Sequence, residues 1–269
     1  MNNSIIERVK SLPPLSKTIA LINKVYLDEN GSVSEMAKVI EGDPMIVANL
    51  LKAASSPLYG FSKEIKNASQ AVSLFGMNMT RSIAVGNSVR KLLNVDLEPY
   101  GISSEQFAHI SSLQAMFLLT WYNQINKDKA QKLFLPVFLQ EMGKILIASN
   151  VIQEDETIPF KSEVAISNNL AQLEKSYVEM NSAQVSALIF EHWAFDDEIV
   201  QIIKYSDNPL NAPQQTQEAS NILNIIKTIV PMNKPFSEQA INFGLKKAQN
   251  LGYNTDELKR AIDTVMEFL

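Results

Sequence analysis

The sequence predicts an all-α protein, a compact multi-helix bundle, and three observations lead to this expectation. Apolar residues recur at intervals of three and four, as at Ile19, Ile22 and Tyr26, which is the spacing of one helix face. Helix-start signals are frequent, such as the capping box formed by Ser32 and Glu35. The alternation of apolar and polar residues that marks strands between hairpin turns is hard to find.

Each predicted helix follows a start signal. Ser32 opens a helix that Gly42 closes. Asp43 caps the next helix, and Pro44 occupies its first position, where a missing N–H costs nothing. Asn67 and Gln70 precede a further helix, and Ser103 begins a long one. From there to the C-terminus, helices are expected near 104–125, 127–149, 162–180, 182–194, 196–206, 216–230, 238–250 and 255–268.

Two polar segments that contain proline, 94–103 and 206–218, are the candidate boundaries. They divide the chain into an N-terminal helical module (1–98), a central helical region (99–210) and C-terminal helices (211–269). The apolar faces of the C-terminal helices must be buried against the central region or against a second copy of the chain. Whether the chain forms a homodimer is therefore left open by the sequence.

The composition narrows the function. The chain has 269 residues, 46% of them hydrophobic, and no cysteine, which excludes disulfides and thiolate metal sites. Its net charge of −5 argues against a nucleic-acid partner, because dedicated nucleic-acid binders usually carry a basic excess. No signal peptide and no apolar run of membrane-spanning length is evident. We expect a cytoplasmic protein with no membrane partner.

One short stretch, FLQEMGKI (138–145), invites a functional interpretation. The polar pair Gln140 and Glu141 interrupts an apolar helix face just before Gly143. Such a pair is either a site or the remnant of one.

Four motifs occur in an order that resembles the HDOD domain, the HD-related output domain of bacterial signalling proteins. They are Leu12-Pro13-Pro14-Leu15, Asp43-Pro44, the run from Ala54 through Ser55, Ser56, Pro57, Leu58 and Tyr59 to Gly60, and Ala71-Val72 leading to Gly76. The resemblance covers about residues 11–206. It implies a helical bundle followed by a region similar to the HD metal-dependent phosphohydrolases, and it implies a regulatory role.

The same resemblance suggests that the metal site is lost. A catalytic relative would carry His and Asp at the positions of Gln140 and Glu141, and His109 falls where a first ligand histidine would lie. The later Asp is missing, since residues 219–237 contain no Asp or Glu, and the expected later histidines, near Ser182 and near 206–207, are also absent. Hydrolytic metal ions need several convergent ligands. We therefore expect no catalysis, no metal and no cofactor, with Gln140 and Glu141 hydrogen-bonded to His109 or to solvent.

Other segments carry plainer expectations. Trp193, beside His192, is expected to pack between two helices, with Asp196 and Asp197 beginning the second of them. Residues 153–163 are expected to form a solvated loop. The serine-rich run 55–60 is expected to be a helix exit and sharp turn, because no nucleophile elbow occurs. The helix of residues 77–93 is expected to be buried, with its basic residues reaching the surface.

Three functions remain open. The first, which we favour, is a non-enzymatic signalling module that contacts separately encoded signalling proteins in trans. The others are a phosphohydrolase or phosphodiesterase with an altered metal site, and a receptor for a nucleotide second messenger. A ligand or partner surface is expected to include Pro13, Pro14, Ser55, Ser56, Tyr59, Arg81 and Arg90.

Overall fold

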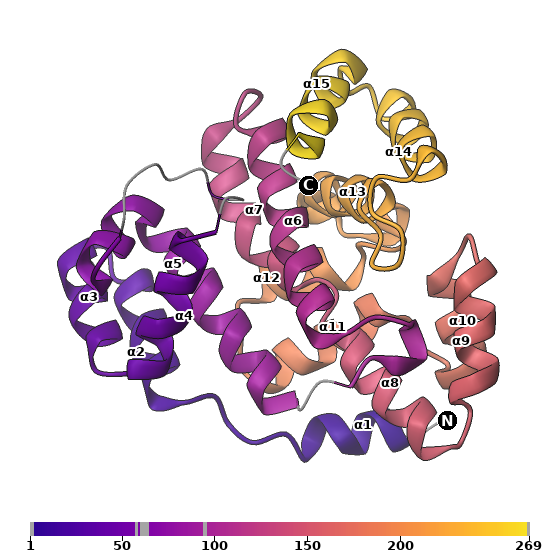
Figure 1. Ribbon diagram of the computed structural model, residues 1–269, viewed down its shortest axis with the longest axis horizontal. Helices are drawn as coiled ribbons and strands as arrows, with labels where there is room; N and C mark the ends of the chain where they lie inside the picture. Colours follow the sequence, from indigo (N-terminus) through magenta and orange to yellow (C-terminus); the bar gives the residue numbers. More distant parts are fainter. Residues whose placement is uncertain (1–2, 57–58, 60–64, 94–95, 268–269) are drawn as a thin grey trace.

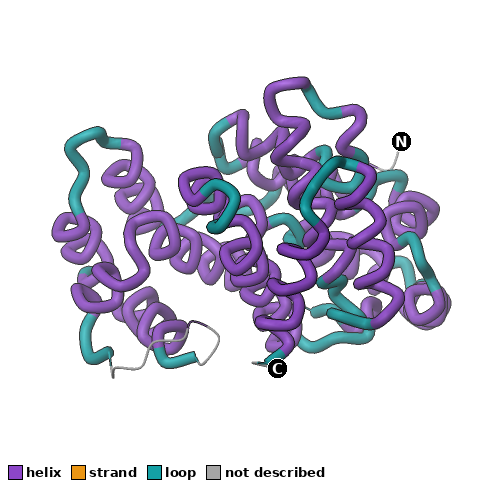
Figure 2. The backbone as a smooth tube through the Cα atoms, turned by 90° about the horizontal axis from the view of Figure 1, so that it is seen from above, coloured by secondary structure: helices purple, strands orange, loops and turns teal. Residues whose placement is uncertain are grey.

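The structure of the chain is a computed structural model, which describes residues 3–56, 59, 65–93 and 96–267. Most of these residues are in helices, and none of the ranges contains a strand (Figure 2). The all-α prediction is confirmed. The helices form one smaller group at one end of the molecule and a larger group that holds the rest (Figure 1).

The smaller group is built from consecutive helices that pack on one another. They are α2 (Lys17–Leu27), α3 (Val33–Glu41), α4 (Pro44–Ala54) and α5 (Ala68–Leu93). The predicted caps are present: Ser32 and Glu35 form a capping box, and Asp43 accepts hydrogen bonds at the start of α4. Helix α1 (Asn3–Lys10) stands apart from this group and packs against α8 and α11.

Helix α5 connects the two groups because it also packs against α7. It is kinked at Gly76, whose φ of 71° is a left-handed conformation that favours glycine. Further along, Gly86 lies against the ring of Phe138 on α7. A Cβ atom at Gly86 would lie 2.2 Å from that ring, so the close approach of α5 and α7 requires glycine.

The larger group contains the remaining elements, in which α6 and α7 form a long packed pair, α12 packs on α7, and α11 packs on both α12 and α8. The elements are η2 (Glu98–Tyr100), α6 (Ser104–Tyr122), α7 (Lys127–Leu139), α8 (Gly143–Gln153), α9 (Thr157–Ile166), α10 (Leu170–Val178), α11 (Ser182–His192), α12 (Asp197–Lys204), η3 (Pro209–Asn211), α13 (Gln214–Ile229), α14 (Glu238–Asn250) and α15 (Thr255–Met266). Helix α13 packs on α12, α6 and α7, and α15 packs on α6, so the C-terminal helices bury apolar faces within the chain.

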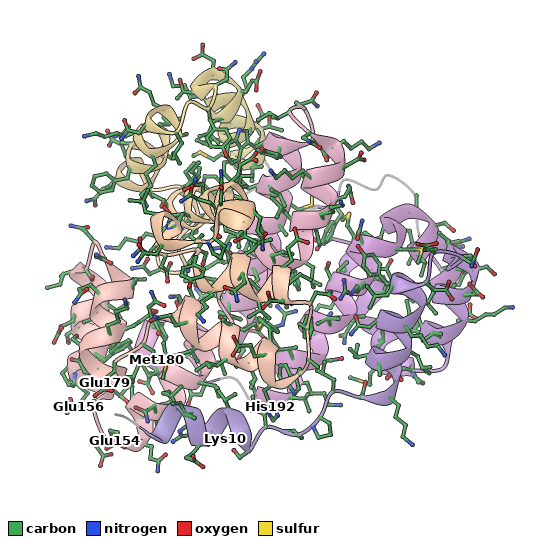
Figure 3. The ribbon with its side chains drawn as sticks, turned by 180° about the vertical axis from the view of Figure 1, so that it is seen from behind. Lys10, Glu154, Glu156, Glu179, Met180 and His192 are labelled. Carbon is green, nitrogen blue, oxygen red and sulfur yellow. The ribbon has the colours of Figure 1, made fainter. Side chains whose placement is uncertain are left out.

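Three expectations about element boundaries were wrong. The helix predicted over 127–149 is two helices, interrupted at Gln140–Met142. The helix predicted over 162–180 is likewise interrupted, at 167–169. The loop expected over 153–163 is only a short turn, because α9 begins at Thr157. The acidic residues of this turn do lie at the outer edge of the molecule, where Figure 3 labels Glu154 and Glu156.

The stretch Lys127–Gln153 is long and apolar enough to cross a membrane, but 89% of its most apolar window is buried inside the protein. Apolar side chains on all sides of a helix are expected where the helix lies at the centre of a helical bundle. This stretch is therefore the core of the larger group.

A buried ion-pair cluster at the HD-like site

At the interruption between α7 and α8, the side chains of Gln140 and Glu141 point into the interior of the larger group. Gln140 is fully buried and Glu141 is 2% exposed. Gln140 donates a hydrogen bond of 2.9 Å to Gln114 Oε1 on α6. The amide nitrogen of Gln114 donates in turn to Glu141 Oε1 at 3.3 Å and to the carbonyl oxygen of Val230 at 2.8 Å. The two amides thereby tie α6, the α7–α8 junction and the end of α13 together.

Lys144 supplies a positive charge one helical turn after Glu141. Its ammonium nitrogen lies 3.3 Å from Glu141 Oε2 and 2.6 Å from Glu174 Oε1, and it donates a 3.0 Å hydrogen bond to Ser182 Oγ. All of these side chains are buried. Lys144 therefore links α8 to α10 and to the start of α11.

A second positive charge, Lys227, comes from α13. Its ammonium nitrogen lies 2.6 Å from Asp207 Oδ1 and 3.9 Å from Glu141 Oε2. We call Glu141, Lys144, Glu174, Asp207 and Lys227 the ion-pair cluster. It holds three carboxylates and two ammonium groups, contributed by elements that are far apart in the sequence.

Electrostatics keep the lysines of the cluster charged. Burial alone would lower the pKa of Lys144, but Glu141 and Glu174 outweigh this effect and raise the pKa above its usual value. Burial opposes the charge on Lys227 in the same way, and Asp207 and Glu141 reverse the shift. Burial also favours the protonated form of Asp207, yet Lys227 and Lys144 lower the pKa of its carboxyl group. Lys144, Lys227 and Asp207 therefore stay charged at neutral pH.

Glu174 has its remaining hydrogen bonds satisfied by its neighbours. Tyr100 Oη donates to Glu174 Oε1 at 3.0 Å, and the backbone N–H of Ser182 donates to Glu174 Oε2 at 2.6 Å. Burial and the nearby Glu174 carboxylate raise the pKa of Tyr100, so the phenol remains a donor. A buried ion pair is stable only when such additional hydrogen bonds compensate for lost water.

The glycine that follows the polar pair has a packing role. The backbone N–H of Gly143 donates a 2.7 Å hydrogen bond to Ser186 Oγ, which donates to the carbonyl oxygen of Gln140 at 3.0 Å. A Cβ atom at Gly143 would lie 2.1 Å from the carbonyl oxygen of Ser182. Close contact between α8 and α11 therefore requires glycine at this position.

His109 does not join the cluster, so the first of the two partners expected for Gln140 and Glu141, His109 or solvent, is wrong. It lies on an exposed face of α6, whereas Gln114, five residues later, is fully buried and supplies the hydrogen bonds. Five residues correspond to a rotation of about 140° around a helix. The two side chains consequently point away from each other.

The residues at this place do not fit a hydrolytic metal ion, which HD-type phosphohydrolases would hold here. Such an ion needs several free oxygen or nitrogen ligands and an open position for water. Here the carboxylates of Glu141 and Asp207 already lie beside the ammonium groups of Lys144 and Lys227, which would repel a divalent cation. Within the described ranges, no group of three or more His, Asp or Glu side chains is arranged to hold a metal ion.

The proline motif is held by the end of α11. Trp193 Nε1 donates a 2.9 Å hydrogen bond to the carbonyl oxygen of Pro13, and His192 Nε2 lies 3.0 Å from the carbonyl oxygen of Leu12. Figure 3 shows His192 near Lys10, on the side where α1 runs. The side chains of Pro13 and Pro14 remain exposed. The half-buried Trp193 thus fastens the segment between α1 and α2, in addition to its contact with Phe190.

Arg81 corrects the expectation that the basic residues of its helix reach the surface, because it is 5% exposed. Its Nε donates a 2.7 Å hydrogen bond to Asn23 Oδ1, and its guanidinium group lies 4.4 Å from the ring centre of Tyr26. It also pairs with Asp196 at 3.7 Å. Asp196 therefore serves as an ion-pair partner, and its side chain makes no capping hydrogen bond to α12.

Arg90, the other arginine of α5, is half-buried and stacks 5.5 Å from the ring centre of Phe138. Burial lowers its pKa to about 10.

Tyr59 is also half-buried and packs edge-on against Phe75. Ser55 ends α4 and is exposed, and Ser56 is partly buried. Pro57, Leu58 and Gly60 of this motif lie outside the described residues.

Four members of the cluster, Lys144, Glu174, Asp207 and Lys227, were not predicted from the sequence, although two local signals were present. Lys144 stands three residues after Glu141, a spacing that places both on one helix face. Lys227 is the one charged residue within the apolar run 219–230. A charge within such a run predicts a buried partner, but the sequence does not say which carboxylate it is.

The fold defines an HD-related helical domain, and the ion-pair cluster lies in its interior. The sequence profile of the HDOD domain matches residues 12–209, so the chain belongs to the HDOD family. An uncharacterised protein of Treponema pallidum is 20% identical over 218 residues, which are 79% of this chain and 40% of that protein. The chain thus spans less than half the length of this relative.

Solved structures share the fold at low sequence identity. A Shewanella amazonensis protein that is provisionally named a phosphohydrolase matches with a TM-score of 0.75 and 20% identity, over 99% of this chain and 94% of its own. An HDOD domain protein of unknown function from Geobacter sulfurreducens matches with a TM-score of 0.69 and 14% identity, over 100% and 97%. A protein from Marinobacter aquaeolei, provisionally named a signal transduction protein, matches with a TM-score of 0.70 and 20% identity, over 97% and 60%.

Proposed function

We propose that this protein is a non-catalytic regulatory module of bacterial signal transduction that acts in the cytoplasm through contacts with other signalling proteins. The observation that carries the proposal is the position of Lys144 and Lys227. Their ammonium groups neutralise carboxylates at the place where a catalytic HD protein would bind its metal ion. The protein keeps the fold and has exchanged metal chemistry for internal ion pairs.

Family membership supports the regulatory part of this proposal. The resemblance to the HDOD domain, the HD-related output domain of bacterial signalling proteins, implies such a role. The name of the Marinobacter structure agrees with such a role. The name of the Shewanella structure favours the competing hydrolase function. The ion-pair cluster favours the first, since hydroxide generation needs a metal ion with an open coordination position.

Elemental analysis tests the proposal. The chain would be purified without chelator after growth with manganese, iron, magnesium and zinc, and metal per chain would be measured together with hydrolysis of phosphate esters and cyclic nucleotides. We expect below about 0.1 equivalents of metal and no hydrolysis above a blank. Near-stoichiometric metal that disappears in Glu141→Ala, with hydrolysis lost in the same variant, would establish the altered-site hydrolase instead.

The partner surface is proposed to include Pro13, Pro14 and Ser55, whose side chains are exposed. Arg81 is left out because it is buried. Once a signalling partner is identified, Pro14→Glu would be expected to weaken its binding, whereas Lys259→Glu on α15 serves as a surface control. Equal binding by the two variants would remove this surface from the proposal.

A further inference from the structure

A cavity of about 810 Å³ lies directly above the ion-pair cluster. Glu141, Lys144 and Asp207 line its inner part. The walls come from α13, α14 and residues 165–171, which include the turn between α9 and α10. Small-molecule sites typically measure about 300–1,000 Å³. The cavity is therefore large enough for an organic ligand.

Two helices present one face each to this cavity. Phe243, Lys246, Lys247 and Asn250 of α14 line it, and their spacing of three and four residues puts them on one side of the helix. Helix α13 contributes Asn224, Lys227 and Thr228 to the lining, and Pro231 follows shortly after its end. The cavity is thus formed by the C-terminal helices packed over the HD-like region.

The lining carries more positive than negative charge. Five lysines line the cavity, against the two carboxylates of Glu141 and Asp207. Lys144 and Lys227 are paired with carboxylates, whereas Lys234, Lys246 and Lys247 have no carboxylate within 4 Å among the described residues. The surplus favours an anionic ligand.

Lys247 is the clearest case of a lysine in this cavity without a carboxylate partner among the described residues. Its ammonium nitrogen donates hydrogen bonds only to neutral acceptors, Asn224 Oδ1 at 2.8 Å and Thr228 Oγ1 at 2.9 Å. Burial lowers its pKa; Asp207 opposes this shift, and Lys227 adds to it. Lys234 donates to the carbonyl oxygen of Ala165 at 3.0 Å, and the side chains of all three lysines are exposed. These nitrogens can turn toward a phosphate group, which is a strong acceptor of charge-assisted hydrogen bonds.

The rest of the lining suits a nucleobase. Phe243 is 49% exposed, and its ring lines the cavity beside the lysines. Aromatic rings stack favourably on nucleobases of any sequence, because every base has a π-face. Amide side chains, which both donate and accept hydrogen bonds, surround the same space; they belong to Asn168, Asn169, Asn233, Gln239 and Asn250.

We propose that this cavity binds a phosphorylated nucleoside, with its phosphate groups held by Lys234, Lys246 and Lys247 and its base stacked on Phe243. Binding needs no metal ion, because the lysines supply the positive charge. The inference goes beyond the proposed regulatory role: it supplies the domain with a small-molecule signal.

Calorimetric titration of the whole chain in buffer containing EDTA tests the proposal, with ATP, GTP and inorganic pyrophosphate as separate probes. We expect saturable binding of ATP or GTP with one site per chain. The double variant Lys246→Gln/Lys247→Gln should weaken it by about tenfold, as removal of charge-assisted hydrogen bonds implies. The matched control is Lys259→Gln/Arg260→Gln, an adjacent exposed basic pair on the neighbouring helix α15, which should bind like the wild type.

The variant Phe243→Ser distinguishes the contribution of the base to binding from that of the phosphate groups. It should weaken nucleotide binding and leave pyrophosphate binding unchanged, because only the base contacts the ring. Three results would overturn the proposal: no saturation by either nucleotide at about 1 mM, equal losses in the two double variants, or pyrophosphate binding as tightly as the nucleotides. Since metal is excluded from these titrations, their outcome is independent of the elemental analysis that tests the absence of catalysis.

Discussion

Lys227 and Asp207 form a nearly buried ion pair of 2.6 Å that joins α13 to the segment after α12. The two side chains are 10% and 12% exposed. Lys227 also lies 3.9 Å from Glu141, so it connects the C-terminal helices to the α7–α8 junction. This pair makes α13 an integral part of the HD-like region, and its removal gives the first prediction.

Lys227→Met should lower the free energy of unfolding by about 3–5 kcal/mol, because it leaves the nearly buried Asp207 carboxylate without its ion-pair partner. Urea denaturation followed by circular dichroism measures this change. Lys259→Met, at an exposed lysine, should change the free energy by less than about 0.5 kcal/mol. The double variant Lys227→Met/Asp207→Asn should regain part of the loss. A loss under about 1 kcal/mol in the single variant would mean that the cluster is dispensable for folding.

Acid should weaken the fold through Asp207. Burial would raise the pKa of this carboxyl group, but Lys227 and Lys144 outweigh burial and lower it. The unfolded chain therefore takes up the proton first, near a pKa of about 3.9, and stability from this group is complete above that pH. It is lost as the pH falls through the lower pKa of the folded state.

The corresponding measurement is the free energy of unfolding between about pH 7 and 3. Asp207→Asn should be less stable than the wild type at neutral pH and should show a shallower decline on acidification. Asp256→Asn, in an 83% exposed side chain, should keep the wild-type slope. Parallel curves for wild type and Asp207→Asn would contradict the lowered pKa.

Gly86→Ala should destabilise the contact between α5 and α7, because the added methyl group would overlap the ring of Phe138. Overpacking costs up to about 3 kcal/mol, and the helical preference of alanine returns about 1 kcal/mol. A net loss of about 2 kcal/mol is expected in thermal or urea unfolding. Gly42→Ala is the control, since its Cβ would meet only a carbonyl oxygen at 3.3 Å. Equal stability of the two variants would show that α5 and α7 can move apart.

Arg81→Lys should cost about 1.5–3 kcal/mol although the charge is kept. Lysine lacks the planar group that bonds Asn23 and stacks on Tyr26 in the same arrangement. Hydrogen exchange should become faster in α2, because Arg81 anchors that helix to α5. The exposed Arg260 provides the control Arg260→Lys. Unchanged exchange in α2 would show that the remaining apolar contacts hold the N-terminal group by themselves.

Much of the helical framework could be predicted because its signals are local. Caps such as Ser32 with Glu35, and Asp43 with Pro44, satisfy backbone groups within four residues of the chain. The breaks at Gln140–Met142 and 167–169 could not be predicted in the same way. The first of them is stabilised by side chains from elsewhere, such as Gln114 and Ser186, and not by a proline or a strong cap at the break.

The sequence by itself determined the helical class, the family and the presence of the polar pair Gln140 and Glu141. Only the tertiary structure decided which charges lie beside Glu141: Lys144 from the next turn and Lys227 from a helix 86 residues beyond Glu141. It also excluded His109, which lies on the wrong face of α6. The physical reason is that helix formation depends on neighbours in the sequence, whereas a buried charge is stable only beside an opposite charge that packing brings to it.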